Sequence, residues 1–329
     1  MRNHPPSHRF AKGASIGAMT LSARVERFIV QMARELRVVD LTSLPIVSDQ
    51  PPLEAVRVSI EDPSRLTLRE TSALAAGFNG RFAMVAFECR DTEFHGAHPL
   101  TLIGEQLREF IPTRWGVISA PFEPDGTTKI RDVGDPNPPS RTLTSEAMAA
   151  HQDGWLSLRS KPGVIAVTGL WADTVGIEPA ATFSQNTLRL SLELLKSDEA
   201  AFAALFADDA VKIVDRSGKV AVIAPVLTIG PGGGPQVFFR GRNDEYDVLP
   251  GANDAATRRA IEFLSAFTSF GSNGSVFTHL DRRGRGLLLN NRHCIHGRTA
   301  FRDGAAPHQK RVIASKWWTS DDDQALVWV

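Results

Sequence analysis

Apolar positions along the chain follow two periods, and the period changes near residue 150. In the first part they recur every three or four residues, the spacing that places them on one face of a helix. The first such helix starts after Ser22, a residue type that suits an N-cap. Its apolar stripe consists of Val25, Phe28, Ile29, Met32 and Leu36. Helices are therefore predicted at residues 22–36, 67–77 and 100–110, with a buried strand at 82–87.

Behind residue 150 the apolar runs are short and rich in β-branched residues, which predicts strands. These strands are expected at residues 164–170, 182–184, 211–214, 220–229, 237–240, 286–290 and 311–318. A helical pair at 186–207 and a long amphipathic helix at 252–270 interrupt them. The glycine cluster at 230–234 lacks the Lys-Ser/Thr and the following helix of a phosphate-binding loop, so we interpret it as a hairpin turn.

Many short strands with inserted and flanking helices predict a mixed α+β, mainly β protein built on a jelly roll, or double-stranded β-helix. The chain of 329 residues is expected to form one domain over residues 19–329, behind a disordered polar tail at 1–18. Residues 118–145 are rich in Pro, Gly and Asp. A long irregular segment before a candidate site is typical of an active-site lid, and a helical insert is expected near 186–270.

Composition excludes several classes of function. Hydrophobic residues at 42% and charged residues at 22% are ordinary for a soluble globular enzyme. Lys+Arg and Asp+Glu both number 37, so no charge excess favours nucleic acid or an anionic membrane. The two cysteines, Cys89 and Cys294, are too few for a disulfide scaffold, and no apolar run is long enough to span a bilayer. We therefore expect a cytoplasmic protein that binds neither nucleic acid nor membrane.

A candidate metal site begins at His151-Gln152-Asp153. An imidazole and a carboxylate two residues apart lie on the same face of a strand. If a distant strand brings His296 beside them, the set is two histidines and one carboxylate, which suits non-haem Fe(II) with its remaining positions open. The spacing of His151 and Asp153 alone is a weak signal, because such pairs arise by chance.

The segment from residue 287 to 318 makes the signal specific. An apolar strand runs into Asn-Asn-Arg, then His-Gly-Arg from His296, then Phe301 and a strand that Arg311 opens. This order resembles the distal-histidine segment of the Fe(II)/2-oxoglutarate-dependent oxygenases, in their clavaminate synthase-like and taurine dioxygenase-like branch. With the proximal pair included, the resemblance covers about residues 150–318, whereas the front third is only loosely similar.

The resemblance implies a role for each matching residue. His151, Asp153 and His296 would bind Fe(II), and Asp153 argues against halogenation, because related halogenases carry a small residue there. Arg311 would clamp the distal carboxylate of 2-oxoglutarate, and Thr182 would hydrogen-bond the same group. Alternatives remain: Arg311 as a surface arginine, with Arg302 or His308 as the clamp, and Thr182 as a buried strand threonine.

The substrate side is less clear from the sequence. Many relatives have a second arginine where this chain has Ser315. An acidic cluster at Asp244, Glu245 and Asp247 is a candidate for meeting a substrate amine or guanidine, although a solvated turn explains it as well. Trp155 is a candidate pocket wall. Other residues near the motifs are assigned to packing or bracing: His293, Cys294, Arg298, Trp317 and Trp318.

The function implied by the resemblance is that of an Fe(II)- and 2-oxoglutarate-dependent dioxygenase, which uses O2 and releases succinate and CO2. The expected substrate is a small amino acid or derivative, free or bound to a carrier protein, in specialised metabolism. Hydroxylation of an unactivated C–H bond is expected first, with desaturation or cyclisation as alternatives. Two alternatives belong to other functional classes. One is a Zn-dependent hydrolase or isomerase that uses the same three residues, and the other is a non-catalytic jelly-roll binding protein.

Overall fold

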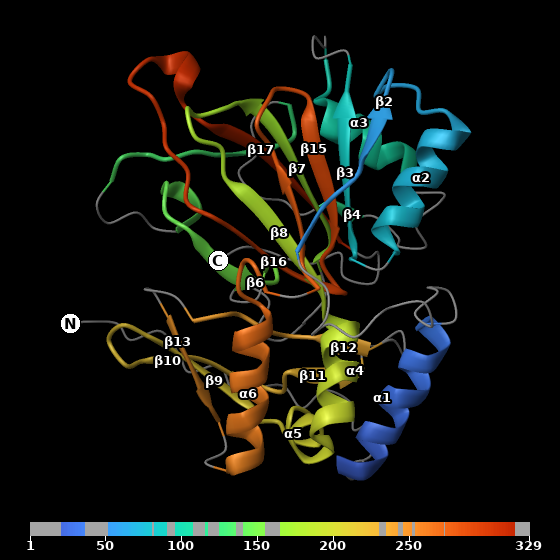
Figure 1. The fold of residues 1–329 in the computed structure, drawn as a ribbon, viewed down its shortest axis with the longest axis vertical. Helices are drawn as coiled ribbons and strands as arrows, with labels where there is room; N and C mark the ends of the chain where they lie inside the picture. Colours follow the sequence, from blue (N-terminus) through green and yellow to red (C-terminus); the bar gives the residue numbers. More distant parts are fainter. Residues whose placement is uncertain are drawn as a thin grey trace, which may run out of the picture.

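A computed structural model gives the fold of the chain (Figure 1). It describes residues 21–36, 52–80, 82–90, 96–107, 116–117, 125–135, 141–154, 165–229, 235–242, 246–251, 254–272 and 274–319. The expected tail at 1–18, the glycine cluster at 230–234 and much of the expected lid lie outside these residues. The protein is a mixed α/β structure, consisting mainly of sheets with several helices.

The larger sheet has seven strands, in the order β2-β3-β15-β7-β17-β4, with β5 also paired to β17. Their bounds are β2 (Arg57–Ile60), β3 (Met84–Cys89), β4 (Gly116–Val117), β5 (Thr128–Ile130), β7 (Ile165–Thr174), β15 (Arg285–Asn290) and β17 (Val312–Thr319). All its pairings are antiparallel except that of β2 with β3.

Helices α2 (Leu68–Phe78) and α3 (Pro99–Leu107) cover the outer face of this sheet (Figure 1). The helix α2 begins at a capping box, in which the Thr67 hydroxyl and the Glu70 carboxylate each accept a hydrogen bond from the other's backbone N–H. The outer core between helices and sheet contains Leu74, Phe78, Phe87, Leu100, Ile103, Trp171, Leu288 and Trp318.

The smaller sheet has five strands, in the order β1-β14-β8-β16-β6. Their bounds are β1 (Leu53–Glu54), β6 (Met148–His151), β8 (Ala181–Asn186), β14 (Val276–His279) and β16 (Cys294–Arg298). The inner faces of the two sheets share one core, because apolar residues of both belong to the same buried cluster: Ala172, Val276, Leu287, Leu289, Cys294 and Ile313. The space between the two sheets is therefore the inside of the fold.

A second layer of structure lies below the sheets in Figure 1 and corresponds to the expected helical insert, joined by the first helix. It contains α1 (Leu21–Leu36), α4 (Thr187–Ser197), α5 (Glu199–Ala204) and α6 (Ala255–Phe267), a sheet ordered β10-β9-β13 and a hairpin of β11 with β12. These strands are β9 (Val211–Asp215), β10 (Val220–Ala224), β11 (Leu227–Ile229), β12 (Pro235–Val237) and β13 (Tyr246–Pro250).

The predicted helices are confirmed, with small shifts at their ends, whereas several strands were missed or misplaced. The strand predicted at 237–240 is only partly right, since β12 ends at Val237 and Arg240 forms a single bridge to His151. The strands β1, β2, β13 and β14 were not predicted, because each is five residues or shorter and lacks a long apolar run.

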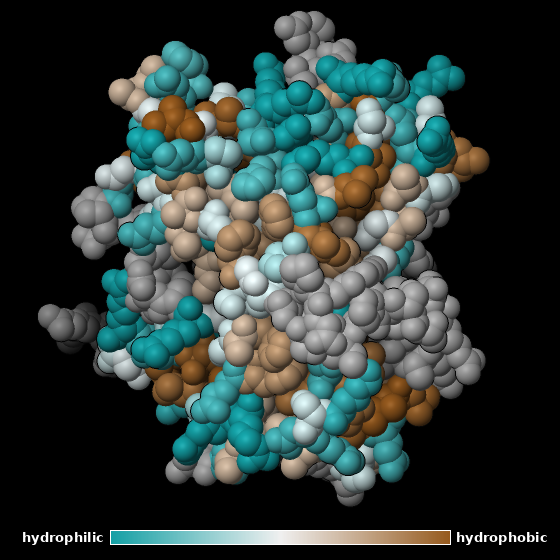
Figure 2. Space-filling model, in the orientation of Figure 1, coloured by the Kyte–Doolittle hydropathy of each residue, from teal (hydrophilic) through white to brown (hydrophobic). Residues whose placement is uncertain are grey.

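On the face seen in Figure 2, hydrophilic and hydrophobic residues are interspersed, and the hydrophobic ones form several small patches. Among the described residues, no helix combines the length and the apolar character needed to cross a membrane.

Phe28 tests how much the helix α1 contributes to stability. Its ring is fully buried and contacts those of Phe202 and Phe206 edge-on, at centroid distances of 5.9 and 5.0 Å. We expect Phe28→Ala to lower the free energy of unfolding by about 3–5 kcal/mol, because it leaves a cavity in this core. The matched control is Val30→Ala on the same helix, where the side chain is 51% exposed. Urea denaturation of both variants measures the difference, and equal losses would contradict the packing role of α1.

Candidate metal centre

The two candidate histidines meet across neighbouring strands of the smaller sheet. His151 ends β6, His296 lies in the middle of β16, and the two are direct partners in the antiparallel register. Opposite residues of an antiparallel pair place their side chains on the same face. Both imidazoles are buried, with ring centroids 4.7 Å apart. The structure therefore brings together two residues that are far apart in the sequence.

Asp153 reaches the histidines from a turn, not from the strand. The expectation that His151 and Asp153 share a strand face is wrong, because β6 ends at His151 and Gly154 takes a left-handed conformation with φ of 77°. Asn291 holds the turn: its side-chain oxygen accepts the N–H of Asp153 at 2.8 Å, and its amide donates to the carbonyls of Asp153 and Ile165. The turn thus folds the carboxylate back over the imidazoles.

The three side chains form a compact donor set. The Asp153 Oδ1 lies 3.5 Å from Nε2 of His151, and its Oδ2 lies 3.6 Å from Nε2 of His296. One donor atom from each residue lies within 4.8 Å of the other two. Metal–ligand distances of about 2.0–2.2 Å place neighbouring donors roughly 3–3.5 Å apart, so these separations suit one shared ion.

Thr168 fixes the carboxylate from the opposite sheet. Its hydroxyl, on β7, donates to Oδ2 of Asp153 at 2.5 Å. Thr168 is buried in a mostly apolar strand, and nothing in the sequence indicated this contact. Trp317 is its partner in the register of β17 and lies on the same inner face, so its half-buried ring borders the site, whereas Trp318 packs in the outer core.

The pKa shifts of Asp153 and His296 are compatible with the protonation states of metal ligands. Burial opposes ionisation of Asp153, but His296, His151 and Thr168 together lower the pKa of its carboxyl to about 2. Burial lowers the pKa of His296 to about 4, with Asp153 opposing that shift. Nδ1 of His151 lies 2.9 Å from the carbonyl oxygen of Ala149, which leaves Nε2 as the atom facing the carboxylate. An ionised carboxylate and a neutral His296 imidazole are the protonation states that a metal requires.

Two buried arginines lie on the same side of the smaller sheet. Arg298 pairs in the register with Thr182, just as His296 pairs with Ser184, so Thr182 and Arg298 share the inner face with His296. The guanidinium groups of Arg298 and Arg311 both lie over the ring of Phe301, at 5.0 and 4.6 Å from its centroid.

Burial raises the energy of these two cations. It lowers the pKa of Arg311 to about 9, with a further contribution from Arg298, and it lowers the pKa of Arg298 to about 10. Nη1 of Arg311 has no hydrogen-bond partner within the part of the chain that the structure describes. The Nη2 of Arg298 donates to the carbonyl oxygen of Thr144. Such a pair of cations is suited to binding an anion.

Arg302 and His308, the alternative candidates for the clamp, are more exposed than Arg311. Arg302 is 63% exposed and pairs with Glu178, and His308 lies exposed on the short 3-10 helix Pro307–Gln309. Of the three candidates, Arg311 is the buried one.

Comparison with known proteins identifies solved structures that share this fold. The sequence matches no protein-family model, and no curated protein matches it significantly. Solved structures do match. Asparagine oxygenase in complex with Fe(II), (2S,3S)-3-hydroxyasparagine and succinate gives a TM-score of 0.51 at 16% identity, over 76% of this chain and 78% of that chain. This chain has the fold of a non-haem iron oxygenase.

The oxygenase OrfP gives the same result in two complexes. With Fe and alpha-ketoglutaric acid its TM-score is 0.54 at 16% identity, over 79% of this chain and 82% of that chain. With Fe, succinate and (3R,4R)-dihydroxy-L-Arg the TM-score is 0.53 at 16% identity, over 90% and 92%. At such identities the likeness concerns the fold, and this oxygenase fold agrees with the resemblance seen in residues 287–318.

The described residues give little support to the predicted substrate-binding residues. Trp155, Asp244 and Glu245 lie outside the described residues. Asp247 belongs to β13 and is therefore not on a loop as predicted; its half-exposed carboxylate pairs with Arg242 at 2.7 Å. Its ion pair and its place in β13 do not support a substrate role.

Cys294 and His293, close to His296 in the sequence, differ in exposure. Cys294 lies on the inner face two residues before His296, and burial raises the pKa of its thiol, so it is a neutral neighbour of the metal set. His293 is half-buried, and desolvation together with the charge of Arg292 lowers its pKa to about 4. The prediction that neither residue is a ligand stays a prediction, although the three-residue cluster contains neither.

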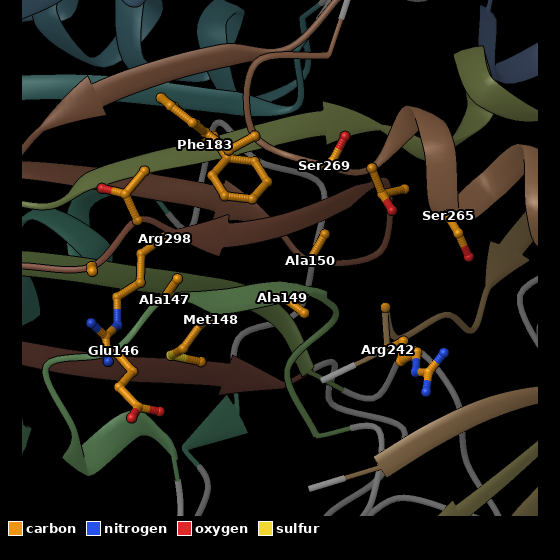
Figure 3. Close-up of a pocket in the computed structure, with 15 residues that line it drawn as sticks. Glu146, Ala147, Met148, Ala149, Ala150, Phe183, Arg242, Ser265, Ser269 and Arg298 are labelled. Atoms are coloured by element: carbon orange, nitrogen blue, oxygen red, sulfur yellow. The ribbon is translucent and has the colours of Figure 1, made fainter. Parts of the chain in front are cut away.

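A groove of about 640 Å³ lies on the other face of the smaller sheet (Figure 3). In Figure 3, Phe183 and Arg298 lie on the side of the sheet strands, and Ser265 lies on the helix α6. Phe183 pairs with Gly297, one residue past His296, so it faces away from the metal set. The residues that line the groove include none of the three candidate ligands. Arg298 is among the lining residues, so the groove adjoins the arginine pair although it contains no candidate metal ligand.

Thr168 provides a test of the metal centre. We expect Thr168→Val to weaken binding of Mn(II) or Co(II) by about 10–100-fold, since it removes the hydrogen bond to the Asp153 carboxylate but keeps the side-chain shape. Thr168→Ser keeps the hydroxyl and is the control, with near wild-type affinity expected. Metal titration followed by the absorption of the Co(II) form measures both. Wild-type metal affinity in Thr168→Val would show that this hydrogen bond does not contribute to metal binding.

Proposed function

We propose that this protein is an Fe(II)- and 2-oxoglutarate-dependent oxygenase of the clavaminate synthase-like and taurine dioxygenase-like branch. The observation that carries the proposal is one buried face that holds both the His151–Asp153–His296 set and the Arg298–Arg311 pair. The fold shared with non-haem iron oxygenases supports it. In this proposal the two facing sheets form a jelly roll, within a single domain that includes the helical insert.

The metal set has the composition that Fe(II) requires. His151, Asp153 and His296 offer two imidazole nitrogens and one carboxylate oxygen, and this set leaves positions open for other ligands. When bound, iron with 2-oxoglutarate and O2 supplies the oxidising power for a C–H bond, with release of succinate and CO2. The protein contributes the fixed position of the ligands: Thr168 and Asn291 hold the carboxylate and its turn.

In the proposal, Arg311 binds the distal carboxylate of 2-oxoglutarate. Its burial and its vacant Nη1 among the described residues favour it over the exposed Arg302 and His308. Thr182 lies on the same face and adds a hydroxyl donor, and Arg298 adds a second positive charge. A bidentate guanidinium–carboxylate pair fixes orientation as well as affinity, so the co-substrate would be aimed at the metal set.

Water exclusion comes from the inner core. Leu287, Leu289 and Ile313 are fully buried on the inner face of the larger sheet, next to the strand that carries Thr168. An apolar surround strengthens the electrostatic contacts of the site and shields its reactive chemistry from water.

The substrate in this proposal is an amino acid or a close derivative, and the reaction is hydroxylation. The support is that asparagine oxygenase and OrfP, which share the fold, were solved with hydroxylated asparagine and arginine. Desaturation or cyclisation would follow from the same chemistry and would appear as a different product mass. A Zn-dependent hydrolase would use the same three ligands but leaves the buried pair of arginines without a function.

Succinate release tests the proposal. We expect purified protein with Fe(II), 2-oxoglutarate and air to form succinate, and a suitable amino acid from a panel to increase the rate. His151→Ala should lose this activity, and Arg311→Gln should raise KM for 2-oxoglutarate at least tenfold, because one buried charge-assisted pair is lost.

Arg302→Gln is the matched control, since it changes an exposed arginine nine residues before Arg311. It should leave KM for 2-oxoglutarate unchanged. Absence of succinate under all conditions, with Zn(II) retained, would favour the hydrolase. Loss of 2-oxoglutarate affinity in the Arg302 variant alone would show that the clamp was assigned to the wrong residue.

A further inference from the structure

A buried glutamine separates two of the candidate metal ligands. Gln152 lies between His151 and Asp153 and is only 4% exposed. Its side-chain oxygen accepts the N–H of Phe239 at 3.2 Å, and its side-chain amide donates to the carbonyl of Asn291 at 2.9 Å. One side chain thereby joins a segment of the helical insert to the residue that holds the Asp153 turn.

The contact between Gln152 and Phe239 is reciprocal. The backbone N–H of Gln152 donates to the carbonyl of Phe239 at 3.3 Å, while its side-chain oxygen accepts the N–H of the same residue. The N–H of Gly241 donates to the Ala150 carbonyl at 2.6 Å, so residues 239–241 run along the edge of β6. Displacement of this segment would break these hydrogen bonds together and release the backbone on both sides of His151.

Asn291 connects this contact to the metal set. Its backbone N–H donates to the Ala166 carbonyl at 3.0 Å, and its carbonyl accepts the Gln152 amide, so its backbone is held from two sides. From that position its side chain bonds the N–H and the carbonyl of Asp153, at 2.8 and 3.2 Å. Metal sites tolerate ligand displacements of only about 0.2 Å. The place of the Asp153 carboxylate therefore depends on hydrogen bonds that begin at Phe239.

The chemistry of an amide suits this position. Glutamine offers a carbonyl acceptor and an NH2 donor at the end of its side chain, so it can satisfy a backbone N–H and a backbone carbonyl at once. Phe239 and Asn291 are 1% and 2% exposed, so water does not readily replace a lost partner. Methionine at this position would fill a similar volume but would leave both backbone groups without the partner that Gln152 provides.

We propose that Gln152 is a positioning residue for the metal set, through which the docking of residues 239–241 of the insert raises the affinity of the site for a divalent metal ion. The inference rests on the metal site of the proposed function, although not on the reaction. Coupling between two equilibria is reciprocal, so a bound metal ion must favour docking of the segment by the same factor.

Metal titration of Gln152→Met measures the first side of this coupling. We expect the affinity for Mn(II) and Co(II) to fall about tenfold, as for other residues that orient a metal ligand, and the absorption of the Co(II) form to shift because Asp153 moves. The matched control is Gln185→Met. Gln185 is 2% exposed and donates to Ser272, and it pairs with Ile295 on the face turned away from the metal set. Its variant should keep the wild-type metal affinity and spectrum.

Hydrogen exchange measures the second side in wild type, where no substitution can impair folding. We expect saturating Mn(II) to slow exchange of the Phe239 and Gly241 amides about tenfold more than that of the Ile213 and Val248 amides, followed by mass spectrometry. Ile213 and Val248 pair within the insert, in the sheet of β9 with β13. General stabilisation by the metal would slow both sets of amides equally.

The outcomes separate this inference from the proposed function. Equal slowing of both sets of amides overturns the coupling. So does wild-type affinity in folded Gln152→Met, or an equal loss of affinity in Gln185→Met. A wild-type protein that binds the metal and shows the coupling but forms no succinate overturns the oxygenase assignment and leaves Gln152 in its role. A wild-type protein that binds no divalent ion overturns both.

Discussion

The carboxylate of Asp153, with its side chain only 13% exposed, is the constraint on which the rest of the site depends. Taking one ion out of water costs on the order of several kcal/mol unless partners compensate it. The compensation comes from both sheets: Thr168 donates from the larger one, and His151 and His296 approach from the smaller one. The carboxylate therefore links the packing of the sheets to the geometry of the donor set, and a bound ion would strengthen the same links that hold the sheets together.

Charges on the inner face are separated along the sheet, and this separation defines what each part of the site can bind. Asp153 with the two histidines offers electron pairs to a cation. Arg298, two residues after His296, and Arg311, which precedes β17, offer positive charge to an anion, and burial lowers the pKa of both guanidinium groups. A molecule with a metal-chelating end and a distal carboxylate satisfies both regions at once. That match is a stronger argument than either cluster alone, because each has an ordinary structural explanation by itself.

The sequence predicted the three candidate donor residues and a preference for Arg311, because flanking motifs accompany them, and the structure places the three donors together. It could not reveal that Asp153 sits on a turn, since the turn depends on the side chain of Asn291, 138 residues away. Thr168 was hidden for a similar reason: a threonine in an apolar strand carries no sign of its partner until the sheets are placed face to face. Burial, which the spacing of residues does not encode, distinguishes Arg311 from the exposed Arg302 and His308 and supports the proposed clamp. Asp247 was predicted to lie on a turn, because a short acidic cluster is typical of turns and loops. Its backbone pairing with β9 instead places it in the strand β13.

The helical insert has a structural role at the metal site, beyond decorating the sheets. Within the described residues, β6 is the last strand of the smaller sheet, so the backbone of His151 would otherwise face outward with unpaired groups. Residues 239–241 of the insert cover that edge, and Gln152 bonds both to them and to Asn291. Displacement of this segment would therefore disturb the edge strand, the Asp153 turn and the position of Arg240 together. Because Gln152 bonds both to Phe239 of the insert and to Asn291, hydrogen bonds connect the insert directly to the turn that carries Asp153.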